Sequence, residues 1–245
     1  MPKSQIIKDI VEDNVSLEKS LTRLLVLAKD VKNKQLEVWV QKELNGYSQE
    51  DELPQYRRAD CPLLEYSGIN GNFQVTNVPL PQHWLEKETF DMISTVSIYD
   101  GVRSINERAN NTSASYRDLT AFAGEIYEKS GGSVSCTSIK HIIPQAVYQK
   151  VCSEVKTKMI TALYELEKKY GCLDELGIDI SNRGIMQIKA DNADLNRSVF
   201  NITVANSETK KERWYSKIAW NVVVPIITGI IGAVVATIII KTFGI

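Results

Sequence analysis

The sequence predicts a mainly α-helical domain with a small irregular or β insertion, followed by one C-terminal transmembrane helix. Three observations predict this fold class. Apolar residues recur at the three-to-four spacing of an amphipathic helix over residues 4–44 and again over residues 145–170. Residues 48–81 are instead rich in Pro, Gly and Asn, which is typical of loops. Near its end the chain has an apolar run, residues 222–240, with no charged side chain.

Length and composition indicate a globular protein. The 245 residues suffice for one large domain or two small ones. The chain is 43% hydrophobic and 24% charged, which excludes a disordered protein. Its net charge of −1 provides no broad positive field, so we expect no nucleic-acid partner.

The cysteines and the N-terminus carry no targeting or metal signal. The four cysteines lie far apart and form no CxxC pair, so free thiols in a reducing compartment are favoured over a metal or redox site. These residues are Cys61, Cys136, Cys152 and Cys172. The first fourteen residues contain no apolar signal-peptide core, so we expect no cleaved signal peptide.

The first three predicted helices lie close together in the sequence. Two amphipathic stripes predict helices over residues 4–13 and 16–31, with Ser16 as the N-cap of the second. A third helix follows Asn33. It should end at Asn45–Gly46, which can adopt the left-handed conformation found at helix C-termini.

The middle of the chain has mixed character. Residues 48–81 predict loops with room for one β-hairpin, and the prolines exclude a central strand there. A helix is expected over residues 83–109, weakened by Gly101 and by β-branched residues. The alternation in "SVSCTSIKHII" predicts a short strand that Pro144 ends.

Residues 145–170 form the clearest predicted helix, which Gly171 closes. We expect the domain to end near residue 180. Residues 181–209 are rich in Asn and contain two short alternating stretches, so they predict a linker with room for a short β element.

The apolar run from Val222 to Ile240 predicts a membrane-spanning helix. Its nineteen residues, at about 1.5 Å each, reach roughly the 30 Å thickness of a bilayer core. A buried strand is the alternative, because the run is rich in β-branched residues. Strands are usually about 3–10 residues long, however, so the length favours the membrane helix.

The flanks of this run predict its orientation. The preceding segment, residues 210–221, is basic and aromatic, whereas the tail, residues 241–245, contains a single lysine. The four cations are Lys210, Lys211, Arg213 and Lys217. This asymmetry predicts a single-pass protein of the inner membrane with its N-terminal domain in the cytoplasm. The cations could bind anionic lipid or serve only as a stop-transfer flank.

Small residues recur every four positions in the predicted membrane helix. Two adjacent rows are formed by Thr228, Gly232 and Ala236 and by Gly229, Ala233 and Thr237. Such rows let membrane helices approach closely, so we expect a homo-oligomer that associates through this helix in the lipid bilayer.

No catalytic motif is present in the sequence. The two histidines, His83 and His141, lack a neighbouring thiol, serine motif or acid in a pattern that would indicate a reaction. Phosphate-binding, dinucleotide-binding and metalloprotease motifs do not occur. We therefore expect a protein that is not an enzyme and that uses neither a cofactor nor a metal.

One stretch, "WVQKELNGYSQEDELPQYR", resembles a known family. Its pattern W-x-x-x-E-L-x-G-Y, an acidic loop and L-P-x-Y-R is similar to the AbiTii domain of bacterial abortive-infection proteins. The pattern is formed by Trp39, Glu43, Leu44, Gly46, Tyr47, Leu53, Pro54, Tyr56 and Arg57. The resemblance covers roughly residues 3–175, within a predicted domain of residues 1–180.

The resemblance implies a role in phage defence and brings no catalytic residues with it. The motif itself is expected to be structural, and Arg57 should pair either with Glu43 or with a ligand phosphate. Together with the apolar run, this implies a membrane-anchored effector that disturbs the inner membrane after its cytoplasmic domain senses a phage or host protein. The alternative is a membrane-tethered sensor or adaptor that binds such a component and causes no damage itself.

Overall fold

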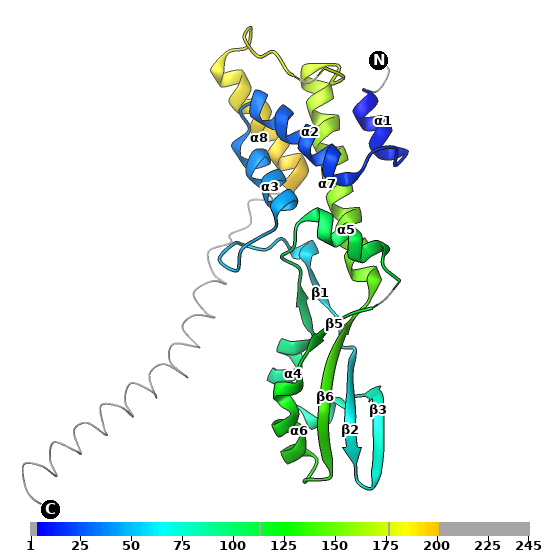
Figure 1. Ribbon diagram of the computed structural model, residues 1–245. Coiled ribbons are helices and arrows are strands. Elements are labelled where there is room, and N and C mark those ends of the chain that lie inside the picture. Colours follow the sequence, from blue (N-terminus) through cyan, green and yellow to red (C-terminus); the bar gives the residue numbers. More distant parts are fainter. Residues whose placement is uncertain (1–3, 113, 176, 201–245) are drawn as a thin grey trace, which may run out of the picture. The chain divides into compact units, whose positions relative to one another are not determined.

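The computed structural model describes residues 4–112, 114–175 and 177–200. These residues belong to one compact unit with two hydrophobic cores. The first core lies among helices and the second lies between a β-sheet and two short helices. Figure 1 shows the helices of the first core gathered around α7.

Within the described part of the chain, six helices contribute side chains to the first core. They are α1 (Gln5–Val11), α2 (Leu17–Asp30), α3 (Lys34–Asn45), α5 (Val102–Asn110), α7 (Gln145–Tyr170) and α8 (Ile185–Phe200). The side chain of Ser16 caps α2 by accepting from the Lys19 amide, and that of Asn33 caps α3 by accepting from the Leu36 amide. The predicted helices over residues 4–13, 16–31 and 145–170 are therefore confirmed.

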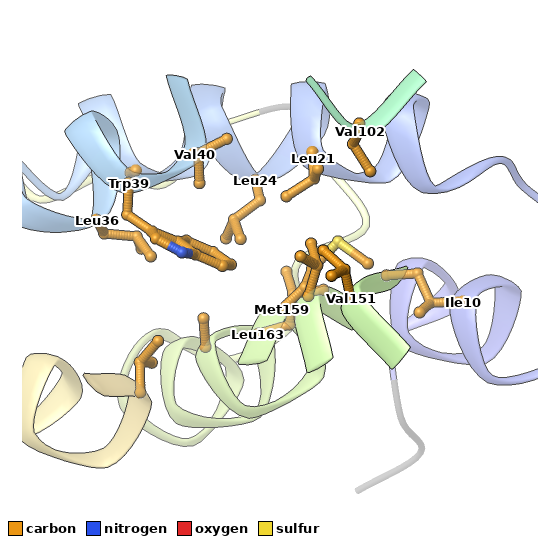
Figure 2. Packing of buried hydrophobic residues seen from close by; sticks show 14 of the residues in the cluster. Ile10, Leu21, Leu24, Leu36, Trp39, Val40, Val102, Val151, Met159 and Leu163 are labelled. Carbon is orange, nitrogen blue, oxygen red and sulfur yellow. The ribbon is translucent and has the colours of Figure 1, made fainter. Parts of the chain in front are cut away.

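The first core consists mainly of buried aliphatic side chains, together with Trp39 and Tyr148. Figure 2 shows Leu24 of α2 and Trp39 of α3 pointing toward Met159 and Leu163 of α7. Leu24, Met159 and Leu163 are each 0% exposed. Truncation of such a leucine to alanine typically costs about 2–5 kcal/mol, because a cavity remains. This packing makes α7 the central element of the helical part.

Strands form two antiparallel sheets. The smaller sheet pairs β1 (Arg58–Asp60) with β4 (Thr95–Ser97). The larger sheet has the order β3-β2-β6-β5. Its strands are β2 (Leu64–Asn70), β3 (Phe73–Pro79), β5 (Ser115–Asp118) and β6 (Val134–Ile143).

One face of the larger sheet carries the second core. The short helices α4 (Lys87–Ser94) and α6 (Ala123–Lys129) contribute Ile93 and Ile126, which pack with Tyr66 and Ile139 of the sheet. The described residues also include three single-turn 3₁₀ helices: η1 (Gln55–Arg57), η2 (Gln82–Trp84) and η3 (Thr120–Phe122). Figure 1 shows α4 and α6 beside β6.

The predicted mainly α fold class is wrong, because two sheets and a separate sheet core occupy the middle of the chain. The region expected to be loops with one hairpin does contain the β2–β3 hairpin, but β2 is a central strand that also pairs with β6 over its whole length. Residues 83–109 are not one helix, because Thr95–Ser97 leave the helical conformation to pair with β1. Proline does remain outside the centre of the sheet, since Pro79 lies on the outer strand β3.

The predicted linker at residues 181–209 is also wrong over most of its length. Residues 185–200 form helix α8, whose Leu195 and Val199 are buried in the first core. Asp191, also buried, accepts hydrogen bonds from Arg183 and Gln187 and lies 3.6 Å from the Lys169 ammonium of α7. Burial of its apolar face and these ion pairs stabilise the helix.

The predicted membrane segment, residues 222–240, lies outside the described residues. So do its basic flank and the two rows of small residues. Among the helices that the structure does describe, none combines the length and apolar character needed to cross a bilayer.

Candidate functional site

The sequence motif of residues 39–57 forms a compact network at one junction of the fold. The C-terminal half of α3 supplies its first residues, and the loop that leads through η1 into β1 supplies the rest. The connection from β4 to α5 closes over them. Tyr47 donates its amide to the Tyr99 carbonyl at 2.8 Å, and Ile98 donates its amide to the Arg57 carbonyl at 2.9 Å. The motif therefore joins the helical part to the smaller sheet.

The centre of the network is an ion pair that solvent does not reach. The Arg57 Nη2 lies 2.6 Å from the Glu43 Oε2, and both side chains are 0% exposed. The Arg57 Nε also donates to the Glu43 Oε1 at 3.4 Å. A buried pair of this kind tolerates the loss of neither partner, because the remaining charge has no water to solvate it.

Two tyrosines complete the coordination of the Glu43 carboxylate. The hydroxyls of Tyr47 and Tyr56 donate to its Oε1 at 2.7 and 2.6 Å. The Tyr56 hydroxyl in turn accepts a hydrogen bond of 2.9 Å from the Trp39 indole nitrogen. The indole packs edge-on against the ring of Phe200 at a centroid distance of 5.8 Å. An aromatic contact and two hydrogen bonds thus connect Phe200 of α8, through Trp39 and Tyr56, to the Glu43 carboxylate.

The remaining contacts of Arg57 are also within the protein. Its Nη1 donates to the carbonyls of Ile98 and Asp100 at 3.1 and 2.7 Å. Its guanidinium lies 4.6 Å from the centroid of the Tyr47 ring, in a cation–π arrangement. Of the two expected partners of Arg57, the structure therefore shows Glu43, and the enclosed guanidinium cannot reach a ligand phosphate.

Burial and the carboxylate change the acidity of the two tyrosines. Burial raises the pKa of Tyr47 well above its ordinary value of 10.0, and the negative charge of Glu43 adds to the effect. The pKa of Tyr56 is raised by the same two causes in the same order. Both hydroxyls therefore stay protonated and act as donors to the carboxylate.

Two glycines allow the backbones to meet at this junction. Gly46 has φ 94° and ψ 173°, a region used almost only by glycine and different from the left-handed helical conformation expected there. A Cβ at Gly46 would lie 2.7 Å from the Tyr99 carbonyl oxygen. A Cβ at Gly101 would lie 2.3 Å from the Leu44 carbonyl oxygen. The end of α3 and the start of α5 are therefore in backbone contact.

The other motif residues support this arrangement. Leu53 is buried, and the Pro54 carbonyl accepts the Arg57 amide at 3.0 Å to form the turn of η1. Leu44 is partly buried against the first core. All nine predicted motif residues are therefore brought together at one place in the fold.

A family model described as AbiTii matches residues 4–184. The chain belongs to the AbiTii family. The matched range agrees with the resemblance identified from the motif. Comparison with curated proteins and with solved structures gave no match. Membership of the AbiTii family indicates a role in abortive-infection defence.

The AbiTii motif has the geometry of a closed structural junction. Its polar groups contact one another or backbone carbonyls, and its charges are enclosed. Within the described ranges, no group of three or more His, Cys, Asp or Glu side chains is placed to hold a metal ion.

Sequence reasoning did not anticipate a second buried polar cluster in the AbiTii domain. His141 of β6 is 0% exposed, and its Nδ1 accepts from the Arg117 Nη2 of β5 at 3.2 Å. Its Nε2 therefore carries the proton and donates to the Cys61 carbonyl at 2.6 Å. Burial lowers the pKa of His141, and the charge of Arg117 acts in the same direction. The pairing of β5 with β6 creates this cluster, and no local motif signals it.

Proposed function

We propose that this protein is an effector of abortive-infection defence that acts at the inner membrane. One observation carries the membrane part of this proposal: a charge-free run of nineteen residues, 222–240, follows the AbiTii domain. Its isoleucines and valines, at about −0.3 to −0.6 kcal/mol each, favour insertion by roughly 5 kcal/mol in total. A protein held in this way would keep residues 1–217 on the cytoplasmic side, because the basic residues flank the run on that side.

In this proposal the trigger acts on the AbiTii domain and the damage occurs in the bilayer. The domain would sense a phage or host protein, and the rows of small residues in the apolar run would bring several copies together. Clustered runs would then disturb the membrane, and the basic residues before them would contact anionic lipid. No catalytic step is required.

The experiment that tests the proposal follows membrane potential in living cells that express the full-length protein, with and without phage. The variant Gly232→Ile should block close approach of the apolar runs while keeping them apolar. We expect it to stay in the membrane fraction and to lose both growth arrest and depolarisation. Depolarisation equal to that of the wild-type protein would contradict the effector function.

A second function, that of a membrane-tethered sensor or adaptor, is favoured by one observation. The run 222–240 contains no ionisable side chain, and ion pathways through membranes usually depend on such groups. An adaptor needs only to be tethered. Replacement of the run by a plain polyleucine segment should therefore preserve phage protection if the protein is an adaptor and abolish it if the protein is an effector.

A further inference from the structure

A cavity of about 310 Å³ opens beside α1. None of the residues that line it belongs to the AbiTii motif, residues 39–57. Its walls come from α1, the turn between α1 and α2, the first turn of α2, and the facing sides of α5 and α7. It is lined by Ile10, Asp13, Val15, Ser16, Leu17, Ser20, Asn106, Cys152, Ser153, Lys156 and Met159. A volume of this size is near the lower end of the range for small-molecule sites.

The lining combines an apolar interior with a polar rim. Ile10 and Met159 are almost fully buried in the first core behind the cavity, whereas Val15 and Leu17 are half-buried and leave apolar surface open to it. Figure 2 shows Ile10 of α1 and Met159 of α7 near one another in this core. Hydroxyl and amide groups of Ser16, Asn106 and Ser153, all on exposed residues, provide hydrogen-bond donors. Such a lining suits a molecule with an apolar body and a polar end.

The two charged residues of the lining form a pair whose members differ in burial. The Lys156 Nζ lies 2.5 Å from the Asp13 Oδ1, and the side chains are 31% and 79% exposed. Asp13 lies in the turn after α1 and has a φ of 57°. Its carboxylate can be fully hydrated without the lysine, whereas the more buried ammonium depends more on an anionic partner.

We propose that this cavity binds a small amphiphilic carboxylate, whose carboxylate replaces Asp13 on Lys156 and whose chain lies against the half-buried side chains of Val15 and Leu17. The rim donors can bind the second carboxylate oxygen. A cavity of about 310 Å³ has room for a short alkyl chain, so octanoate serves as the probe. The proposal does not depend on how the protein acts at a membrane, since binding alone is measured.

The test uses a thiol of the lining as a reporter. Full-length protein is treated with N-ethylmaleimide over a series of octanoate concentrations, and alkylation of each cysteine is followed by peptide mass spectrometry. Cys152 lines the cavity, whereas Cys172 is exposed outside it and reports any general effect on the reagent. At an octanoate concentration about ten times that for half-protection, only about a tenth of the molecules have an empty cavity, so we expect alkylation of Cys152 to be about tenfold slower, with no change at Cys172.

The role of charge in binding is tested in two ways, with a ligand of opposite charge and with variants of the charged lining residues. Octylamine, which has the same chain and a positive end, should not protect Cys152. The variant Lys156→Met keeps the alkyl stem and should lose the protection by octanoate. Lys150→Met, an exposed lysine on the same helix outside the cavity, should keep it. Asp13→Asn frees the ammonium and should lower the octanoate concentration for half-protection several-fold.

The results that would overturn the proposal are distinct from these. They are a lack of protection by octanoate, equal slowing at Cys152 and Cys172, equal protection by octylamine, or unchanged protection in Lys156→Met. An unchanged half-protection concentration in Asp13→Asn would show that the ligand does not displace this carboxylate. The growth-arrest result for Gly232→Ile tests the proposed membrane function and does not affect the interpretation of these binding measurements.

Discussion

Replacement of Glu43 by glutamine should strongly destabilise the domain. The amide would keep one oxygen for Tyr47 and Tyr56, but it would place an NH₂ group where the Arg57 Nη2 now donates over 2.6 Å. The guanidinium would then be an uncompensated charge with 0% exposure. Loss of one partner from a buried ion pair costs about 3–5 kcal/mol.

This cost can be measured as a shift in the thermal unfolding midpoint. For a domain of this size, 1 kcal/mol lowers the midpoint by about 2–4 °C, so Glu43→Gln should lower it by roughly 6–20 °C. Circular dichroism of the full-length protein provides the readout. Glu107→Gln is the matched control, because Glu107 pairs with Arg103 on the surface with both side chains about 70% exposed. It should change stability by no more than about 0.5 kcal/mol.

A double variant measures the interaction energy between Glu43 and Arg57 separately from the cost of losing either side chain alone. Glu43→Leu combined with Arg57→Met removes both charges and should be less destabilised than the sum of the single variants, by about 2 kcal/mol or more. The reasoning would be refuted if Glu43→Gln melted within about 2 °C of the wild-type protein. It would also be refuted by strict additivity in the double variant, since Arg57 would then not depend on the carboxylate.

Three further predictions concern the junction and α8. Gly46→Ala should cost about 1–3 kcal/mol more than Gly71→Ala in denaturant unfolding, because both have positive φ but only Gly46 has a carbonyl in the path of a Cβ. The wild-type protein should lose stability above pH 10.0, because the unfolded chain releases the Tyr47 proton there while the folded chain retains it. Tyr47→Phe should make this decline shallower by about 1.4 kcal/mol per pH unit, and an unchanged slope would contradict the assignment. Leu195→Ala should cost about 2–5 kcal/mol, whereas Ile185→Ala, at a 74% exposed position of the same helix, should have little effect on the melting temperature; equal effects would contradict the packing of α8.

The local signals in the sequence were sufficient for helices α1, α2, α3 and α7, but not for α5 and α8. The periodic stripes of residues 4–31 and 145–170 and the cap Ser16 predict helices that the structure contains, and the structure adds Asn33 as the cap of α3. Gly46 was correctly predicted to end α3. The end of a helix at a glycine depends only on that residue and its neighbours in the sequence. The motif from Trp39 to Arg57 identified the family, since its residues lie within nineteen positions of one another.

Contacts between distant segments were decided only by the tertiary structure. Strand β2 reads as part of a loop-rich stretch until it pairs with β6, about seventy residues later, and α8 is a helix because Leu195 and Val199 are buried against the first core. The same holds for the site: the sequence indicated that Arg57 could pair with Glu43, but not that the carbonyls of Ile98 and Asp100 would enclose it. Helix formation depends on residues three or four positions apart, whereas strand pairing and the burial of a charge depend on groups that only folding brings together.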